Sequence, residues 1–514
     1  MRTVIFGVDG LTFRILRPLI ERGDLPNFAR LQREGVSAEC LSTIPPLTPA
    51  AWMSIATGLK PAKHGVFDFW EYDMASPHHE AKLVTHRKGG KAIWNILSEY
   101  GKQVIVMNVP LTYPAEAVNG IMVSGLMTPG TSSPFTFPAA FRNELFQAVP
   151  NYCIDLSFQN VPLKQWYDEV MKMTEQRMRL QEYLLSGHEW DFAFLCYVGP
   201  DRLQHRLWGE LMTFSHEATR YFRLLDDALG RVLSRLTAED MLFVVSDHGF
   251  VGAKQWFYIN EYLRRRQLLD AGSSPDQSQR LVIGPVREVA RKLRLLGLAR
   301  KTRKKYQERF DRRTADERRE EFHQPFFNEV DWSAVRACVL SSSAFNGGSA
   351  DIVFSSDITP ADVEELKQAI EAERHPRTGA PLARAVYATK DLGDGPFLPP
   401  VEHLIVIPCA GTTFHLGTGR RNLWEMLDET KGIHEAEGVF FAWGAGIRQG
   451  VRVEPLQIYD LVPTLLHSLD IHAGEPFDGR VAREIFVEPQ AGYERAAAES
   501  LVARKVRRLQ ARRI

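Results

Sequence analysis

The sequence predicts an α/β fold in which helices pack on a layered, mostly parallel sheet. Apolar, β-branched runs of strand length alternate along the chain with longer segments of helical periodicity. The first run, 3-TVIFGVD-9, is almost wholly apolar, which is typical of a central parallel strand buried on both faces. The 514 residues suffice for one large domain with insertions, or for about two to three units.

The first half of the chain shows this alternation most clearly. The segment 24-DLPNFARLQREGV-36 has the start of a capped helix. Residues 161–187 and 214–236 carry apolar residues at helical spacing over lengths that strands do not reach. The predicted helices cover 24–36, 50–58, 161–187 and 214–236, and the predicted strands cover 3–9, 103–110, 120–125, 191–199 and 241–249.

The alternation breaks at about residue 262. Strands are predicted at 335–342 and 349–355 and a helix at 359–373, and the core pattern resumes with 402–408, 438–444 and 456–469. We therefore predict a discontinuous α/β core, an inserted cap that selects the substrate, and a basic C-terminal helix. The predicted bounds are 1–261 with 401–485 for the core, 262–400 for the cap and 486–514 for the helix.

Two segments are strongly basic. Residues 287–320 hold 14 Lys or Arg against six Asp or Glu, and residues 495–513 are rich in Arg. A solvated helical surface explains this pattern. A peripheral contact with an anionic membrane is the sharper alternative, because Val289, Leu293 and Leu296 share one helical face. Neither segment has the features of a nucleic-acid-binding module, so the sequence carries no specific nucleic-acid signal.

The overall composition does not indicate a particular binding partner. Lys plus Arg and Asp plus Glu both number 63, and the apolar content of 44% is ordinary for a globular protein. The sequence has no apolar run of about 18 residues and opens on a strand instead of the apolar region of a secretory leader. The five cysteines form no C-x-x-C pair. We expect reduced thiols and a cytoplasmic location.

Acidic residues and histidines directly follow three predicted strands. Asp9 follows the first strand, Asp201 and His205 follow the strand that ends near residue 199, and Asp247 and His248 lie at the end of 241–249. Ligands of open α/β sheets bind outside the carboxyl ends of the strands, so these side chains are expected at one edge. Asp and His are ligands of Zn²⁺ and its borderline neighbours.

His434, in 431-KGIHEAEGVFFAWG-444, is a further candidate ligand beside a predicted strand. Every candidate has an ordinary alternative. An Asp after a strand often caps a helix or forms a turn, and most of the 15 histidines must be surface or hydrogen-bonded residues. The order and shared context of the whole set, more than any single position, predict a metal site.

The segment 42-STIPPLTPAAWMSIATGLKP-61 places a threonine hydroxyl at the start of a helix. Three prolines hinder helix formation in the approach, and Gly58 ends the helix that follows. Thr48 therefore lies at or next to a helix N-terminus, where the dipole favours an anion. An N-cap without chemistry is the ordinary alternative. We interpret His64, just beyond, as a hydrogen-bonded packing residue.

Together these motifs resemble the alkaline phosphatase superfamily, and most closely its type I phosphodiesterase and nucleotide pyrophosphatase branch. The match extends in scattered blocks over residues 1–255 and 400–480. It consists of Asp9 after the first strand, Thr48 ahead of 54-SIATGLKPAKHG-65, Asp201 with His205, 247-DHG-249, His434 and the closing segment 459-YDLVPTLLHSLDI-471. The resemblance implies a three-layer core with a mostly parallel central sheet and an inserted cap.

The resemblance also implies two divalent metal ions and a reaction. One ion would be held by Asp9, Thr48, Asp247 and His248, and the other by Asp201, His205 and His434. Zn²⁺ suits this set, and Mn²⁺ is the alternative. Thr48 would be the nucleophile of a phosphohydrolase and would form a phosphothreonine intermediate. The expected substrate is a phosphodiester on a small molecule, a lipid or a sugar.

Several alternatives stay open. Ser42 and Thr43 are rival nucleophiles, and the same ligands serve phosphomonoester, phosphonate and phosphosugar mutase chemistry. An inactive metal-binding scaffold for a phosphorylated ligand is another possibility. Nucleotide-cleaving members carry an Asn where this chain has Phe69, beside Asp68, which argues against nucleotide specificity. The sequence lacks the C-x-P-x-R motif of sulfatases in this region, and 7-GVDG-10 is not a dinucleotide-binding loop.

Overall fold

The computed structural model describes residues 1–72, 81–156, 162–269, 335–340, 348–399, 402–474 and 476–487. The basic insertion 287–320 lies outside these residues, as does the predicted basic helix from residue 488 onward. Among the described helices, none combines the length and the apolar content that a membrane crossing requires.

A ten-stranded sheet forms the core, in the order β18-β2-β17-β9-β1-β8-β5-β6-β7, with β19 paired to β2. The five adjacent strands β9 (Met241–Val245), β1 (Thr3–Val8), β8 (Phe192–Tyr197), β5 (Val104–Met107) and β6 (Gly120–Val123) are parallel. Antiparallel pairs join β17 (Glu437–Gly444) to β9 and to β2 (Val36–Leu41), and β7 (Thr136–Phe137) to β6. The short strands β18 (Val451–Arg452) and β19 (Leu456–Gln457) lie parallel to β2. The sheet is mixed and mostly parallel, which confirms the predicted fold class.

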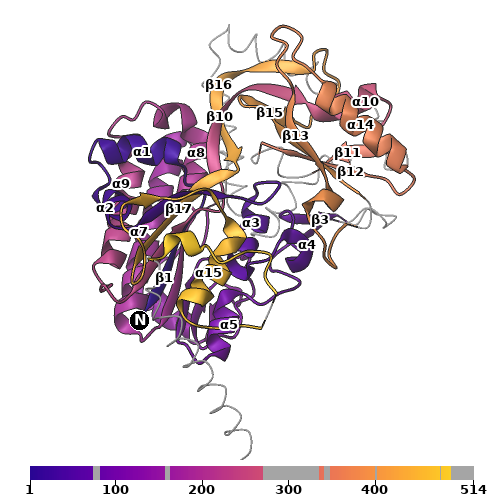
Figure 1. Cartoon of the computed structure of the whole chain (residues 1–514). Helices are drawn as coiled ribbons and strands as arrows, with labels where there is room; N and C mark the ends of the chain where they lie inside the picture. Colours follow the sequence, from indigo (N-terminus) through magenta and orange to yellow (C-terminus); the bar gives the residue numbers. More distant parts are fainter. Residues whose placement is uncertain are drawn as a thin grey trace, which may run out of the picture.

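Helices cover both faces of this sheet, so the core has three layers (Figure 1). Successive side chains of a strand point to opposite faces, and β1 shows this directly: Val4 and Phe6 join one apolar cluster and Ile5 joins the other. The first cluster includes residues of α1 (Phe13–Glu21), α2 (Pro26–Glu34), α6 (Phe141–Ala148), α7 (Leu163–Gly187), α8 (Gly199–Leu211) and α9 (Arg220–Leu233). The second includes residues of α3 (Thr48–Thr57), α5 (Ile93–Glu99) and α15 (Leu461–Ser468).

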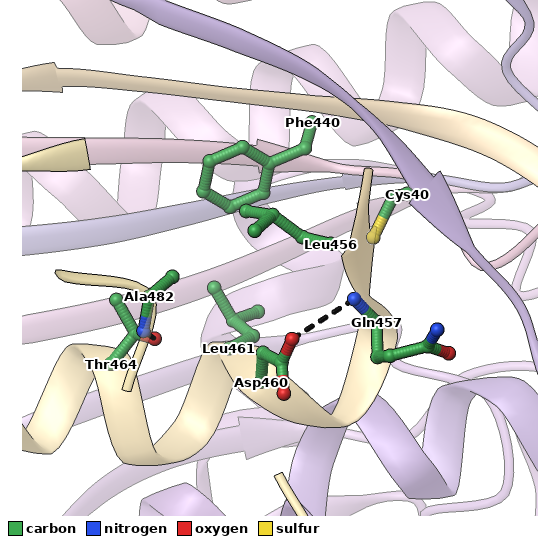
Figure 2. A pocket seen from close by; sticks show the side chains of 8 residues that line it. All are labelled: Cys40, Phe440, Leu456, Gln457, Asp460, Leu461, Thr464 and Ala482. Carbon is green, nitrogen blue, oxygen red and sulfur yellow. Dashed lines mark hydrogen bonds between the residues drawn. The ribbon is translucent and has the colours of Figure 1, made fainter. Parts of the chain in front are cut away.

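The C-terminal part of the core packs on the antiparallel side of the sheet. Figure 2 shows Leu456 and Leu461 beside Phe440, with Asp460 accepting a hydrogen bond of 3.0 Å from the Gln457 N–H. Asp460, at the end of the 3₁₀ helix η4 (Ile458–Asp460), also accepts one of 2.9 Å from the Arg480 N–H. The remaining cavity is about 10 Å³, room for one water at most, so this segment is closely packed.

Two smaller sheets form a second body with its own apolar cluster. Its strands β10 and β16 extend from this body toward the core (Figure 1). The three-stranded sheet runs β15 (Thr412–His415), β10 (Gly249–Tyr258) and β16 (Trp424–Glu435). The four-stranded sheet runs β11 (Ala337–Val339), β12 (Ala350–Phe354), β14 (Leu404–Pro408) and β13 (Ala383–Ala388), together with α10 (Ile259–Arg265) and α14 (Pro360–Ala372). The remaining described elements are α4 (Pro61–His64), the hairpin β3 (Trp70–Tyr72) and β4 (Ala81–Leu83), η3 (Thr389–Leu392) and η5 (Arg483–Ile485).

Three predicted elements differ from the structure. The prediction that the core resumes at 402–408 is wrong, because β14 pairs with β12 and β13 in the smaller sheet. The predicted strand 241–249 is shorter in the structure: β9 ends at Val245, and Gly249 already begins β10, which belongs to a different sheet. The helix predicted from residue 214 begins at Arg220, since Phe214 has a φ of 50° and turns follow it. The predicted domain bounds stay a prediction.

Asp226 of α9 stabilises the start of α2 from a distant part of the chain. No side chain caps α2 locally, and its first backbone N–H groups instead donate to the buried Asp226 carboxylate. Asp226→Ala should leave the N–H groups of Asn27 and Phe28 without acceptors and cost about 1–3 kcal/mol of stability. Urea unfolding followed by circular dichroism checks this loss. Asp227→Ala removes the same charge from the neighbouring exposed position and is expected to change stability by less than about 0.5 kcal/mol.

Candidate metal centre

The central strands bring the first candidate ligands together. β1 pairs in parallel with both β8 and β9, so the carboxyl ends of the three strands are neighbours. Asp9 follows β1, Asp201 and His205 lie on α8 directly after β8, and Asp247 and His248 follow β9. All five side chains are at most 6% exposed.

The split between β9 and β10 brings His434 to the same edge. β10 begins at Gly249, immediately after His248, and leaves the central sheet to pair with β16. In that antiparallel pair Phe250 lies opposite His434, so the histidine returns to the start of β10. α8 packs closely on this pair because glycines line the contact: a Cβ on Gly432 would lie 2.1 Å from the Gln204 carbonyl oxygen.

Thr48 enters the site from the other side of the sheet. It is the first residue of α3, it is buried, and Pro49 at the next position suits the first turn of a helix. Its Oγ1 lies 3.3 Å from Nε2 of His248. As predicted, Gly58 ends the helix in the left-handed conformation, with a φ of 70°.

The ligand atoms form two adjoining groups. Donor atoms of Asp9, Asp247 and His248 all lie within 4.8 Å of one another, and so do donor atoms of Asp201, His248 and His434. His248 therefore lies within reach of both groups. Its Nε2 is 3.5 Å from Oδ1 of Asp9, 3.3 Å from Oδ2 of Asp247 and 4.0 Å from Oδ1 of Asp201.

His205 lies next to the second group. Its Nε2 lies 3.1 Å from Oδ1 of Asp201 and 2.9 Å from Nε2 of His434. The Nε2 of His434 lies 3.2 Å from the same Asp201 oxygen. Potential ligand atoms of Asp201, His205 and His434 thus lie within 3.2 Å of one another.

The three histidines are oriented by backbone carbonyls. The Nδ1 atoms of His205, His248 and His434 lie 3.3, 3.1 and 2.9 Å from the carbonyl oxygens of Gly432, Gly249 and Pro46. A carbonyl only accepts, so we assign the proton to Nδ1 in each ring. Each Nε2 then directs a lone pair into the centre, which is the arrangement that metal-binding histidines use.

Asp9 and Asp247 each have one fixed and one free oxygen. Trp52 Nε1 donates to Oδ2 of Asp9 over 3.0 Å, and the Gly10 N–H donates to Oδ1 of Asp247 over 3.0 Å. The other oxygens, Oδ1 of Asp9 and Oδ2 of Asp247, are buried and have no hydrogen-bond partner among the described residues. Buried carboxylate oxygens that lack donors fit a cation.

The electrostatics also fit cations. Burial and the charge of Asp201 raise the pKa of Asp9 well above its ordinary value. Burial and the charge of Asp9 do the same for Asp247. Burial alone would raise the pKa of Asp201, but His205 and His434 hold it well below the ordinary range. Divalent cations would supply the positive charge that keeps neighbouring carboxyl groups ionised.

Other predicted residues have contacts outside this centre. Thr43 Oγ1 donates to the Pro45 carbonyl over 2.7 Å. Asp68 is buried and accepts a hydrogen bond of 2.5 Å from the Phe69 N–H. His64 is fully buried, accepts from the Val66 N–H over 3.2 Å and bonds the Ser54 hydroxyl over 3.0 Å, which agrees with a packing role.

Comparison with known proteins agrees with this arrangement. The model of the type I phosphodiesterase / nucleotide pyrophosphatase family matches residues 3–335. The chain belongs to this family. It is therefore a hydrolase of the alkaline phosphatase superfamily with a candidate two-metal centre.

Solved structures with the same fold include phosphodiesterases. Mouse ectonucleotide pyrophosphatase/phosphodiesterase 5 has 13% identity and a TM-score of 0.53, with 95% of this chain and 100% of that chain covered. An inactive threonine-to-alanine variant of the mouse protein, in complex with AMP, has 13% identity and a TM-score of 0.52, with the same coverage of both chains. The human counterpart has 14% identity and a TM-score of 0.50, again with 95% of this chain and 100% of that chain covered. No curated protein matches the chain in sequence.

The family motifs do not include the residues that support the ligands. Trp52 could have been found, since it lies four positions after Thr48 and therefore on the same side of the helix. Arg202 follows Asp201 directly and is buried, with its Nη1 3.5 Å from Oδ2 of Asp201. Asp155, which pairs with Arg202, gives no local signal because 47 positions separate the two.

Trp52→Phe tests the support of Asp9. The change keeps an aromatic side chain but removes the only donor to Oδ2 of Asp9 among the hydrogen bonds of the described residues. We expect about 10–100-fold weaker metal affinity, measured by competition with a chromophoric chelator. Trp94→Phe is the matched control: Trp94 is equally buried in the same cluster and donates to Glu116 instead. Equal affinity in the Trp52 and Trp94 variants would contradict this role.

Proposed function

We propose that this protein is a two-metal phosphodiesterase that uses Thr48 as its nucleophile. The observation that carries the proposal is the position of the Thr48 hydroxyl. It lies at a helix N-terminus and 3.3 Å from a histidine that both ligand groups share. A protein that only bound a phosphorylated ligand would not need this hydroxyl, which argues against an inactive scaffold.

We assign the ligands to two ions in the way that the family resemblance implies. Asp9, Asp247, His248 and Thr48 would hold one divalent ion, and Asp201, His205 and His434 the other. Bound Zn²⁺ or Mn²⁺ would lower the pKa of a coordinated hydroxyl or water and offset charge on the phosphoryl oxygens. Zn²⁺ is the first choice because imidazole and carboxylate together suit it.

The chain supplies the nucleophile and its direction. The Thr48 oxygen forms a bond to phosphorus while the bond between phosphorus and the leaving oxygen breaks, and the leaving oxygen then takes up a proton. Water attacks the phosphothreonine, which releases the phosphoryl group and restores the Thr48 hydroxyl. The N-terminus of α3, ten residues long, favours the anionic phosphoryl group throughout.

Thr48→Ala should abolish turnover without unfolding the protein. Loss of a nucleophile costs about 10³-fold or more in turnover, and Thr48→Ser should retain part of the activity because it keeps a hydroxyl. The measurement is hydrolysis of bis(p-nitrophenyl) phosphate with Zn²⁺ or Mn²⁺. Ser42→Ala and Thr43→Ala test the rival hydroxyls. If Thr48→Ala retains turnover and either Ser42→Ala or Thr43→Ala loses it, the nucleophile is the residue whose substitution abolishes turnover.

The inactive threonine variant of the mouse relative, whose complex contains AMP, supports a threonine role in this fold. It does not settle the substrate of this chain, because Phe69 occupies the position of the amide donor that nucleotide-cleaving members carry. A phosphodiester without a nucleotide is therefore the proposed substrate class.

Substrate preference separates the members of the superfamily. We expect Thr48-dependent release of p-nitrophenol from bis(p-nitrophenyl) phosphate to exceed release from p-nitrophenyl phosphate by about tenfold or more in kcat/KM, a difference of about 1.4 kcal/mol in transition-state stabilisation. Faster Thr48-dependent release from the monoester would reassign the protein as a phosphatase or mutase. The same assay with phosphonate esters tests for phosphonate hydrolase activity.

A further inference from the structure

The support of Asp201 differs from that of the other two carboxylates. An indole N–H holds Asp9 and a backbone N–H holds Asp247, and both donors are neutral. Next to Asp201 lies a guanidinium, with Nη1 of Arg202 3.5 Å from Oδ2. A full positive charge beside a metal ligand repels the metal unless another charge offsets it.

Asp155 supplies that opposite charge. Its Oδ2 lies 2.8 Å from Nη2 of Arg202, and its Oδ1 lies 3.4 Å from Nε, so the carboxylate meets the guanidinium through two oxygens. The Arg202 side chain is 8% exposed and that of Asp155 is 20% exposed. Solvent therefore screens this pair little.

The loop that carries Asp155 is held in place from α7. Gln176 donates to the Asn151 carbonyl over 2.9 Å and accepts from the Cys153 N–H over 2.9 Å. Arg177 donates to the Ile154 carbonyl over 2.6 Å from a fully buried position. These bonds fix the backbone on the N-terminal side of Asp155, so the carboxylate has a defined position.

We propose that Asp155 and Arg202 form a charge-balanced pair that positions Asp201 as a metal ligand. Arg202 orients Oδ2 of Asp201 and leaves Oδ1 to face the histidines. Asp155 cancels the charge that Arg202 would otherwise add beside the cation. Both are positioning residues, since they act through Asp201. The inference rests on the proposed two-metal function and assigns two residues to it that the family motifs do not contain.

The test is a double-mutant cycle on the full-length protein, with Zn²⁺ affinity as the readout. Competition with a chromophoric chelator gives the two dissociation constants without any turnover. Asp155→Asn leaves the Arg202 charge unbalanced, so we expect one of the two dissociation constants, that of the site built on Asp201, to rise about 10–100-fold. Asp155→Asn with Arg202→Gln removes both charges, and we expect it to regain about tenfold over Asp155→Asn alone.

Two comparisons guard against a general effect on folding. Arg206→Gln removes a guanidinium one turn further along α8, where Cζ of Arg206 lies 4.7 Å from the centre of the Trp166 ring. This control variant should leave the metal affinity unchanged. Circular dichroism of the metal-free variants checks the fold. If Asp155→Asn does not fold, Asp155→Glu and Asp155→Gln provide a pair that differs only in charge, and the Glu variant should bind about tenfold more tightly.

Several results would overturn the inference. Asp155→Asn with unchanged affinity removes Asp155 from this role. A double variant that binds no more tightly than Asp155→Asn contradicts charge balance and leaves Asp155 a purely structural residue. A changed KM with unchanged metal affinity in Arg202→Gln assigns Arg202 to the substrate instead. If the unmodified protein binds fewer than two ions, the proposed two-metal function is wrong. If it binds two ions and Asp155→Asn binds them equally tightly, only this inference is wrong.

Discussion

Three carboxylates share the buried end of the central sheet, and their mutual repulsion constrains the whole centre. Asp9, Asp201 and Asp247 are each at most 4% exposed, so water cannot offset their charges. Burial raises the pKa of both Asp9 and Asp247, and it is close contact with His205 and His434 that keeps the pKa of Asp201 low. Such a cluster is costly to the fold unless cations complete it, which is why metal binding and stability should be coupled here.

The parallel order of the strands creates this cluster, and the second body completes it. β8, β1 and β9 end side by side, so they deliver acidic residues to one edge of the sheet. His434 comes from β16, which belongs to a sheet outside the core. The continuous passage of the chain from His248 into β10, and the pairing of β10 with β16, connect the two bodies through the ligand set itself. A shift of β16 along β10 would therefore displace His434 from the other ligands.

The sequence was informative where chemistry follows a local pattern. A buried parallel strand that ends in Asp, or in Asp-His, predicts both the element and its edge, and β1 and β9 agree with this. The same reasoning misplaced 402–408, because an apolar strand does not reveal which sheet it joins. The sequence reasoning also did not identify Asp155, because its partner Arg202 lies 47 positions away. Pairing over such distances is decided by tertiary packing, which a single sequence does not display.

The three carboxylates are held by three kinds of donor, and the difference has a consequence. An indole and a backbone N–H orient an oxygen without adding charge, so the Asp9 and Asp247 ligands need no compensation. A guanidinium beside Asp201 does need it, and Asp155 is the group that meets Arg202 through both oxygens. The half of the centre built on Asp201 therefore depends on a loop that contains no ligand, while the half built on Asp9 and Asp247 depends on α3 and on the turn after β1. Substitutions in the loop 151–156 should thus weaken the ion held by Asp201 more than the ion held by Asp9 and Asp247.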